Sequence, residues 1–238
     1  MFISNVLNTF CVFKVLLWLY LISRIDLTLT NMHLLLLTTV FVVIYPSCVN
    51  MCFRTRSKGD SDGDQGNACT TITIISRDTW GARPARSSSV ISVPVPNIYI
   101  HHTDGNPCTS SSACITRMTQ IQNYHMDTRG YDDIGYSFLI GEDGKIYVGR
   151  GWDRIGAHTK NYYYNSRSYG ISFIGNFMTR APNTVALNAA KSLIQCGIHN
   201  GKISGSYDLY GHRDIKSTLC PGDTLYNIIQ SWPHFHGP

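Results

Sequence analysis

Two histidines and one cysteine are the side chains in this sequence best suited to hold a catalytic metal. His101 ends a short β-rich run, His212 follows another, and Cys220 comes eight residues after His212. A catalytic zinc takes three protein ligands and keeps one position open for water, and two His with one Cys is a known set. Zinc lowers the pKa of that water and polarises a carbonyl under attack. These residues therefore predict hydrolytic zinc chemistry if the fold brings them together.

The spacing of the three residues is by itself a weak signal. The gap after His212 is long enough for a loop to return Cys220 to the strand end, and His101 must then come from a neighbouring strand. Two alternatives stay open at this point. His101 and His102 fit polar strand-end positions, and Cys220 could form a disulfide with Cys52, because Cys52 and the five cysteines from Cys69 onward make an even number.

Strand and helix signals alternate from residue 69 to the end of the chain. Hydrophobic periodicity predicts strands at 97–101, 136–140, 145–148, 170–174 and 207–211, and helices at 112–129, 183–199 and 224–232. Glu142-Asp143-Gly144 marks a hairpin turn between the second and third strands. Helices interleaved with strands predict an α/β sheet covered by helices.

The first 68 residues differ in composition from the rest. Residues 5–22 are largely apolar, and residues 34–45 are apolar or Thr. Twelve such residues are short for a membrane span and fit a signal-peptide core. Residues 1–50 therefore predict a hydrophobic leader, either a signal peptide or a membrane anchor, with Met32 as a possible true start. Residues 51–68 predict a flexible linker, since 54–67 contain no apolar residue. Residues 69–238 remain for one domain.

The net charge indicates which kind of partner the chain binds, and the cysteine content indicates in which compartment it acts. From Asn67 onward 15 Lys and Arg stand against 11 Asp and Glu, a net charge of +4. This balance favours an anionic partner such as a bacterial surface, and the chain lacks the Lys/Arg clusters that predict nucleic-acid binding. Eight cysteines favour an oxidising, extracellular space. The six-residue separation of Cys108 and Cys114 suits a small disulfide, although spacing does not fix the connectivity.

Ten motifs in order resemble the peptidoglycan recognition protein family, which is related to phage zinc amidases. The resemblance spans roughly residues 69–236. The motifs are ISRDTWGAR (75–83), IHHT (100–103), IQNYHM (121–126), DIGYSFLIG (133–141), YVGRGW (147–152), GAH (156–158), GISFIG (170–175), GHRD (211–214), CPG (220–222) and WPH (232–234). So many ordered motifs over a whole domain make coincidence an inadequate explanation.

The resemblance implies a single α/β domain with a central mixed β-sheet, flanking helices and a substrate groove on one face. It implies Zn²⁺ held by His101, His212 and Cys220, with Tyr136 and Thr218 as catalytic residues. It also implies two disulfides, Cys108–Cys114 and Cys69–Cys196, and leaves Cys52 over. Many family members have lost the cysteine ligand and only bind, so its retention here favours an enzyme.

The implied function is a secreted, monomeric zinc-dependent N-acetylmuramoyl-L-alanine amidase that cuts bacterial peptidoglycan in innate immunity. The alternatives are a non-catalytic peptidoglycan-binding receptor and an antibacterial binder. The chain is expected to be attached to a membrane only if the leader is an uncleaved anchor. Whether the stem peptide carries lysine or diaminopimelate at its third position is left open.

Six further residues are candidates for substrate contacts. They are His102, Thr103, Trp152, Arg154, His158 and Arg167. Trp152 offers a stacking face for sugar or peptide, and either arginine could pair with the extra carboxylate of diaminopimelate. A structural role is the first interpretation of His102, and a core or capping role is an equal alternative for Trp152 and His158. His125, on the apolar face of a predicted helix, is interpreted as a core histidine.

Overall fold

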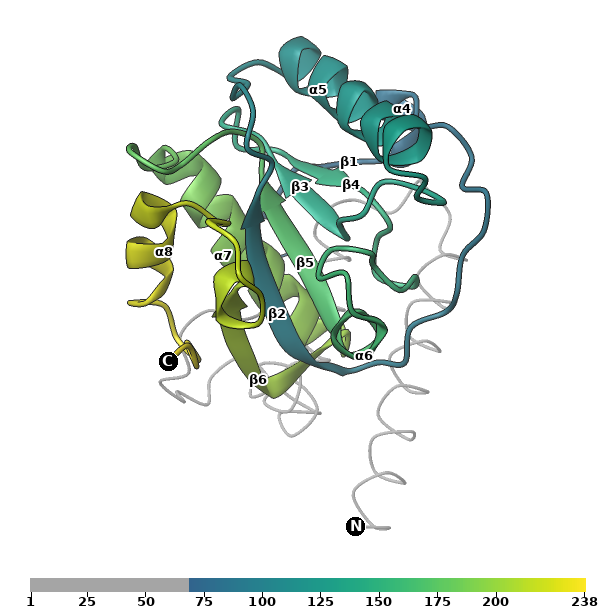
Figure 1. Ribbon diagram of the computed structural model, residues 1–238. Coiled ribbons are helices and arrows are strands. Elements are labelled where there is room, and N and C mark those ends of the chain that lie inside the picture. The colour runs from purple at the N-terminus through teal and green to yellow at the C-terminus, as the bar shows by residue number, and fades with distance from the viewer. Residues whose placement is uncertain (1–68) are drawn as a thin grey trace, which may run out of the picture. The chain divides into compact units, whose positions relative to one another are not determined.

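A six-stranded sheet in the order β1-β4-β3-β5-β2-β6 forms the centre of the fold (Figure 1). The computed structural model describes residues 69–238, which lie within one compact unit. The strands are β1 (Ile74–Ile75), β2 (Val95–His102), β3 (Phe138–Ile140), β4 (Ile146–Val148), β5 (Ser168–Phe173) and β6 (Ile203–Gly211). The neighbours β3 and β4 pair antiparallel and the other neighbouring pairs are parallel, which confirms the mixed sheet.

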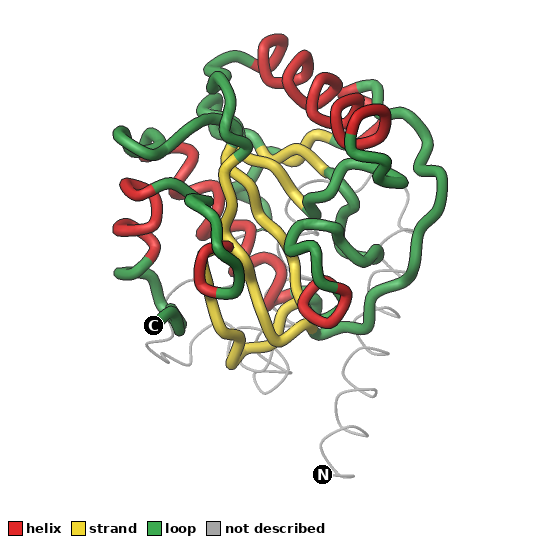
Figure 2. Tube along the Cα trace, viewed as in Figure 1, coloured by secondary structure: helices red, strands yellow, loops and turns green. Residues whose placement is uncertain are grey.

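Helices cover the sheet unequally. They are α4 (Arg77–Trp80), α5 (Ser111–Asn123), α6 (Tyr162–Asn165), α7 (Thr184–His199) and α8 (Asp223–Ile229), with a π-helical turn η2 (Tyr124–Thr128) and a 3₁₀ turn η3 (His212–Asp214). In Figure 2 the helix α7 lies behind the middle strands, whereas no long helix lies in front of β2 and β5. One face of the sheet is therefore left open for a site.

Two apolar clusters explain this arrangement. The face of α7 that includes Ala186, Ala190 and Leu193 is buried in a large core with Ile98 and Ile171 of the sheet. A smaller cluster holds α4 and α5 against the other end of the sheet; it includes Trp80, Met118, Leu139 and Tyr147. The side chain of Asn183 caps α7 by accepting the N–H of Ala186, and Ser110 caps α5 by accepting the N–H of Ala113.

The predicted helix at 112–129 and the predicted strand at 136–140 differ from the structure at their ends. Regular α-helix stops at Asn123 and continues as the π-helical turn η2. The strand β3 starts only at Phe138, so Tyr136 stands in the loop before it. There the carbonyl of Tyr136 accepts the N–H of Arg150, which fastens the loop to the segment after β4. The predicted hairpin turn is confirmed by the antiparallel β3–β4 pair.

The two disulfides implied by the resemblance are present. Cys108 is bonded to Cys114, and Cys69 to Cys196. The first closes the loop that follows β2, and the second fastens the start of the described chain to α7. Cys220 has a free, buried thiol, so the alternative disulfide with Cys52 is wrong.

The predicted leader (1–50), the predicted linker (51–68) and Cys52 itself lie outside the described residues. Within residues 69–238 no helix combines the length and the apolar character that a membrane crossing requires.

Two leucines of opposite exposure test the position of the core. Leu209 of β6 is fully buried, whereas Leu219 is 66% exposed. Leu209→Ala is expected to lower the free energy of unfolding by roughly 2–5 kcal/mol, because it removes buried contacts and leaves a cavity. Leu219→Ala is the same change at the surface, and its free energy of unfolding should stay within about 0.5 kcal/mol of that of the parent chain. Urea unfolding measures the stability of both variants, and an equal loss of stability in the two would contradict the position of this core.

Candidate metal centre

The three predicted metal ligands converge at one end of two neighbouring strands. His101 lies near the end of β2, His212 directly follows β6, and Cys220 lies in the loop between η3 and α8. The strands β2 and β6 are parallel, and Ile100 is in register with Gly211. The residue after each of these is a histidine, so the pairing of Ile100 with Gly211 brings His101 beside His212.

The distances fit a tetrahedral metal site. One ligand atom from each of His101, His212 and Cys220 lies within 4.8 Å of the others. The Nδ1 of His101 is 3.7 Å from the Sγ of Cys220, and the rings of His101 and His212 are 4.6 Å apart at their centroids. Ligand atoms around a tetrahedral zinc stand about 3.3–3.6 Å from one another, as the usual Zn–N and Zn–S bond lengths require.

One orphaned atom shows that the cluster suits a cation. The Nε2 of His212 is buried and has no hydrogen-bond partner among the described residues. A buried polar atom without a partner costs free energy, so such atoms are uncommon outside functional sites. Imidazole nitrogen and thiolate sulfur are the donors that zinc prefers. The residues present therefore fit a zinc ion.

Burial sets the charge state of the cluster in the metal-free chain. It lowers the pKa of His101 well below its ordinary value and the pKa of His212 to about 4, so both rings are neutral at neutral pH. Burial also raises the pKa of the Cys220 thiol to about 12. A bound dication reverses this last effect, because a coordinating thiol loses its proton.

Tyr136 and Thr218 stand next to these ligands. The ring of Tyr136 is 5.3 Å from the ring of His101 between centroids. Burial raises the pKa of Tyr136, so its hydroxyl keeps its proton and can donate. The Oγ1 of Thr218 accepts the backbone N–H of Cys220 at 3.3 Å. Each of the two predicted catalytic residues therefore lies beside one of the ligands.

Two of the predicted substrate contacts, His102 and His158, have side chains that are buried and hydrogen-bonded within the protein. His102 is 6% exposed, and its Nδ1 accepts the N–H of Phe177. Neighbouring residues on a strand point to opposite faces, so His102 points away from the face of His101. His158 does lie beside His101 but is 5% exposed, and both of its ring nitrogens have partners within the protein.

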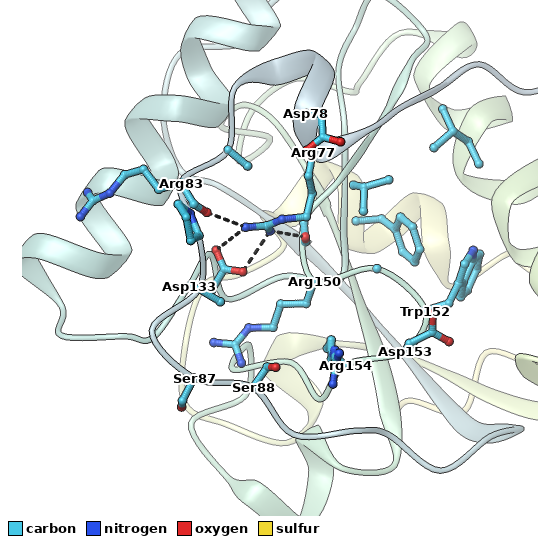
Figure 3. A pocket seen from close by; sticks show the side chains of 18 residues that line it. Arg77, Asp78, Arg83, Ser87, Ser88, Asp133, Arg150, Trp152, Asp153 and Arg154 are labelled. Carbon is cyan, nitrogen blue, oxygen red and sulfur yellow. Dashed lines mark hydrogen bonds and ion pairs between the residues drawn. The ribbon is translucent and has the colours of Figure 1, made fainter.

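Trp152 and Arg154 lie away from the cluster. Trp152 packs its ring against Phe138 and Tyr169, whose ring centroids are 4.3 and 4.9 Å distant. Tyr169 has the opposite parity to Ser172, the β5 partner of His101, so Trp152 packs behind the sheet. With Arg154 it lines a separate pocket of about 680 Å³ that none of the three ligands reaches (Figure 3). The structure therefore does not bring these two residues to the metal centre.

The remaining two candidates have different surroundings. Thr103 directly follows β2, and its hydroxyl accepts the N–H of Gly175 beside the cluster. Arg167 is exposed and stacks over the ring of Tyr163 at the other end of β5. Arg167 lies five positions before Ser172, the register partner of His101. At about 3.3 Å per residue this places the backbone of Arg167 about 16 Å from the ligands.

His125, interpreted from the sequence as a core histidine, is half-buried and has a hydrogen-bond partner. It lies in the π-helical turn η2, and its Nδ1 accepts the N–H of Gly135 at 3.0 Å. Its ring is 5.6 Å from that of Tyr136 between centroids. Ser168 of β5, which contacts His158, is not among the residues predicted from the sequence. A lone serine ten residues from a histidine carries no signal in the sequence.

Comparison with known proteins agrees with this geometry. Residues 92–223 match the family described as N-acetylmuramoyl-L-alanine amidase. The chain is 46% identical to peptidoglycan recognition protein 1 of Bos indicus, a match that covers 68% of this chain and 85% of that protein. It is 44% identical to an N-acetylmuramoyl-L-alanine amidase of Mus musculus, covering 67% of this chain and 30% of the relative.

Solved structures show the same fold. Drosophila PGRP-LB superposes with a TM-score of 0.68 at 44% identity, covering 70% of this chain and 97% of that one. Peptidoglycan recognition protein-LE superposes with a TM-score of 0.68 at 40% identity, covering 69% and 96%. The fold and the site thus define an α/β domain of the amidase type. Within that class, the chain belongs to the peptidoglycan recognition protein family.

The surroundings of His125 predict a pH dependence of stability. Burial lowers its pKa to about 4 in the folded chain, against about 6.5 in the unfolded chain. Between these values the unfolded chain binds one more proton, so this histidine's contribution to stability is full above pH 6.5 and is lost as the pH falls towards 4. His125→Asn keeps an acceptor for Gly135 and removes the titration. The free energy of unfolding is measured by urea unfolding in the presence of a chelator at several pH values between about 6.5 and 4. It should fall less with decreasing pH in the variant than in the parent chain. The same pH dependence in both proteins would contradict the lowered pKa of His125.

Proposed function

We propose that this chain is a zinc-dependent N-acetylmuramoyl-L-alanine amidase, which hydrolyses the bond between muramic acid and the stem peptide of bacterial peptidoglycan. The observation that carries the proposal is the cluster of His101, His212 and Cys220 within 4.8 Å, with the orphaned nitrogen of His212. Two relatives bear the name of this activity. Structural neighbours have been solved with tracheal cytotoxin, a monomeric diaminopimelic acid-type peptidoglycan.

Each residue around the cluster has its own role in the proposed reaction. When bound, zinc polarises the scissile carbonyl and lowers the pKa of a coordinated water. The protonated hydroxyl of Tyr136 donates a hydrogen bond to the oxygen that gains charge as the carbonyl is attacked. Thr218 accepts from the backbone of Cys220 and keeps its own hydroxyl proton available to the water or the substrate. Thr103 lies close enough to the ligands to contact the substrate, and Arg167 could meet only a part of the substrate that extends along β5.

The proposal also includes the domain limits of the chain and its extracellular location. Residues 1–50 act as a leader, 51–68 as a linker and 69–238 as the amidase domain, which is monomeric. The two disulfides of the described chain suit an oxidising, extracellular space. There the enzyme degrades bacterial peptidoglycan as part of innate immunity.

Loss of the cysteine ligand tests the activity. The full chain is incubated with purified muropeptides carrying either lysine or diaminopimelate, and peptide release is measured with zinc, with a chelator and for Cys220→Ser. Release is expected only from the zinc-loaded parent chain, because serine is a much poorer zinc ligand than thiolate. A folded, zinc-loaded parent chain that binds muropeptides without releasing peptide would replace the amidase by a peptidoglycan-binding receptor.

Removal of the tyrosine hydroxyl separates catalysis from metal binding. Tyr136→Phe is expected to keep zinc and to lower kcat by about 10²–10³, the usual effect of losing one donor to an oxyanion. Tyr163→Phe is the control, because Tyr163 is 60% exposed on α6 and should change neither quantity. Steady-state kinetics and zinc content check both variants. Unchanged kcat in Tyr136→Phe would remove this residue from the mechanism.

A further inference from the structure

A chain of hydrogen bonds leads from a backbone carbonyl to the metal ligand His101. The Oγ of Ser168 lies 2.6 Å from the carbonyl oxygen of Tyr164 and 3.4 Å from the Nε2 of His158. The Nδ1 of His158 lies 3.1 Å from the Nε2 of His101. Ser168 and both histidines are buried. None of these contacts is needed to form the sheet.

The carbonyl at the start of the chain fixes the direction of every bond. A carbonyl only accepts, so Ser168 donates its single proton to Tyr164 and must accept from His158. The proton of a neutral His158 is then on Nε2, which leaves Nδ1 as an acceptor. His101 therefore donates from Nε2, and its Nδ1 carries the free lone pair. That Nδ1 is the atom that faces Cys220 at 3.7 Å.

The ring of His158 is closely packed against two glycines. A Cβ at Gly170 would lie 2.4 Å from the His158 Cγ, and a Cβ at Gly156 would lie 2.5 Å from its Cδ2. Asn165 accepts the backbone N–H groups of His158 and Thr159 through its Oδ1. The sequence thus places glycine on two sides of the ring and a buried amide at its backbone.

We propose that His158 and Ser168 are positioning residues, which orient His101 and fix its tautomer so that Nδ1 is presented to the metal. The inference rests on the proposed function, because it concerns one of the three proposed zinc ligands. Histidine ligands commonly donate their second ring N–H to a partner, and losing that partner costs about 10–100-fold in metal affinity or activity. His158 thereby acts through His101 instead of touching the substrate.

The test compares two side chains of the same shape at position 158. Asparagine places an acceptor where Nδ1 of His158 stands, whereas leucine has no polar atom. His158→Leu in the full chain is expected to weaken zinc binding by about 10–100-fold, and His158→Asn should recover most of the loss. Zinc affinity is measured by competition with a chromophoric chelator. Ring ¹⁵N NMR of the metal-free chain should show His101 protonated on Nε2 in the parent chain and in His158→Asn.

A pair of serines supplies a milder test if the variants at 158 do not fold. Ser166 and Ser168 both donate to carbonyls of α6, but only Ser168 contacts His158. Ser168→Ala is expected to weaken zinc binding several-fold, and Ser166→Ala to leave it unchanged. A purely structural role would lower thermal stability in the metal-free state without this difference in affinity.

The outcomes separate the two proposals. A parent chain that binds no zinc overturns the proposed function and this inference together. A parent chain that binds zinc, with leucine and asparagine at 158 equal in affinity or with Ser168→Ala equal to Ser166→Ala, overturns the inference alone. A His101 ring protonated on Nδ1 in the metal-free parent chain also overturns it.

Discussion

The parallel pairing of β2 with both β5 and β6 is the constraint on which the site depends. It places Ile100 opposite Gly211 and His101 opposite Ser172, so residues 111 and 71 positions apart in the sequence meet near the same end of these strands. A shift of one residue in either register would turn the side chains to the other face. The buried apolar residues Ile98 and Ile100 oppose such a shift, because it would expose them. The core therefore also fixes the metal centre.

Side chains alternate along β2, so the two faces of the sheet carry different kinds of residue. Tyr99 and His101 point to the open face, whereas Ile98 and Ile100 point into the core beneath α7. This explains why Trp152 and His102, which the family motifs contain, lie on the covered side of the sheet and not on the face of His101. It also explains the place of His158, whose ring lies against Gly170 of β5 on the open side.

Sequence patterns predicted the elements that depend on residues close together in the chain. They did not predict the features that depend on contacts between distant residues. The hairpin at Gly144 and the long helix α7 follow from turn chemistry and periodicity, and both are present. The π-helical turn at Tyr124–Thr128 has no such signature. The convergence of His101, His212 and Cys220 came from the resemblance and not from their spacing. The bond between His101 and His158 spans 57 residues, so only the fold reveals it.

The electrostatics explain how this fold can be stable before a metal arrives. Burying charged imidazoles would be costly, but burial lowers the pKa values of His101 and His212 so that the rings stay neutral. The Cys220 thiol is likewise neutral, and its sulfur accepts the N–H of His102. The apo cluster thus leaves one unpaired nitrogen, on His212, instead of buried charges. The sheet register brings His101 and His212 together without requiring buried charge. A fold of this kind can lose a ligand and keep its sheet, so peptidoglycan binding and the proposed amidase activity are separable properties of the same domain.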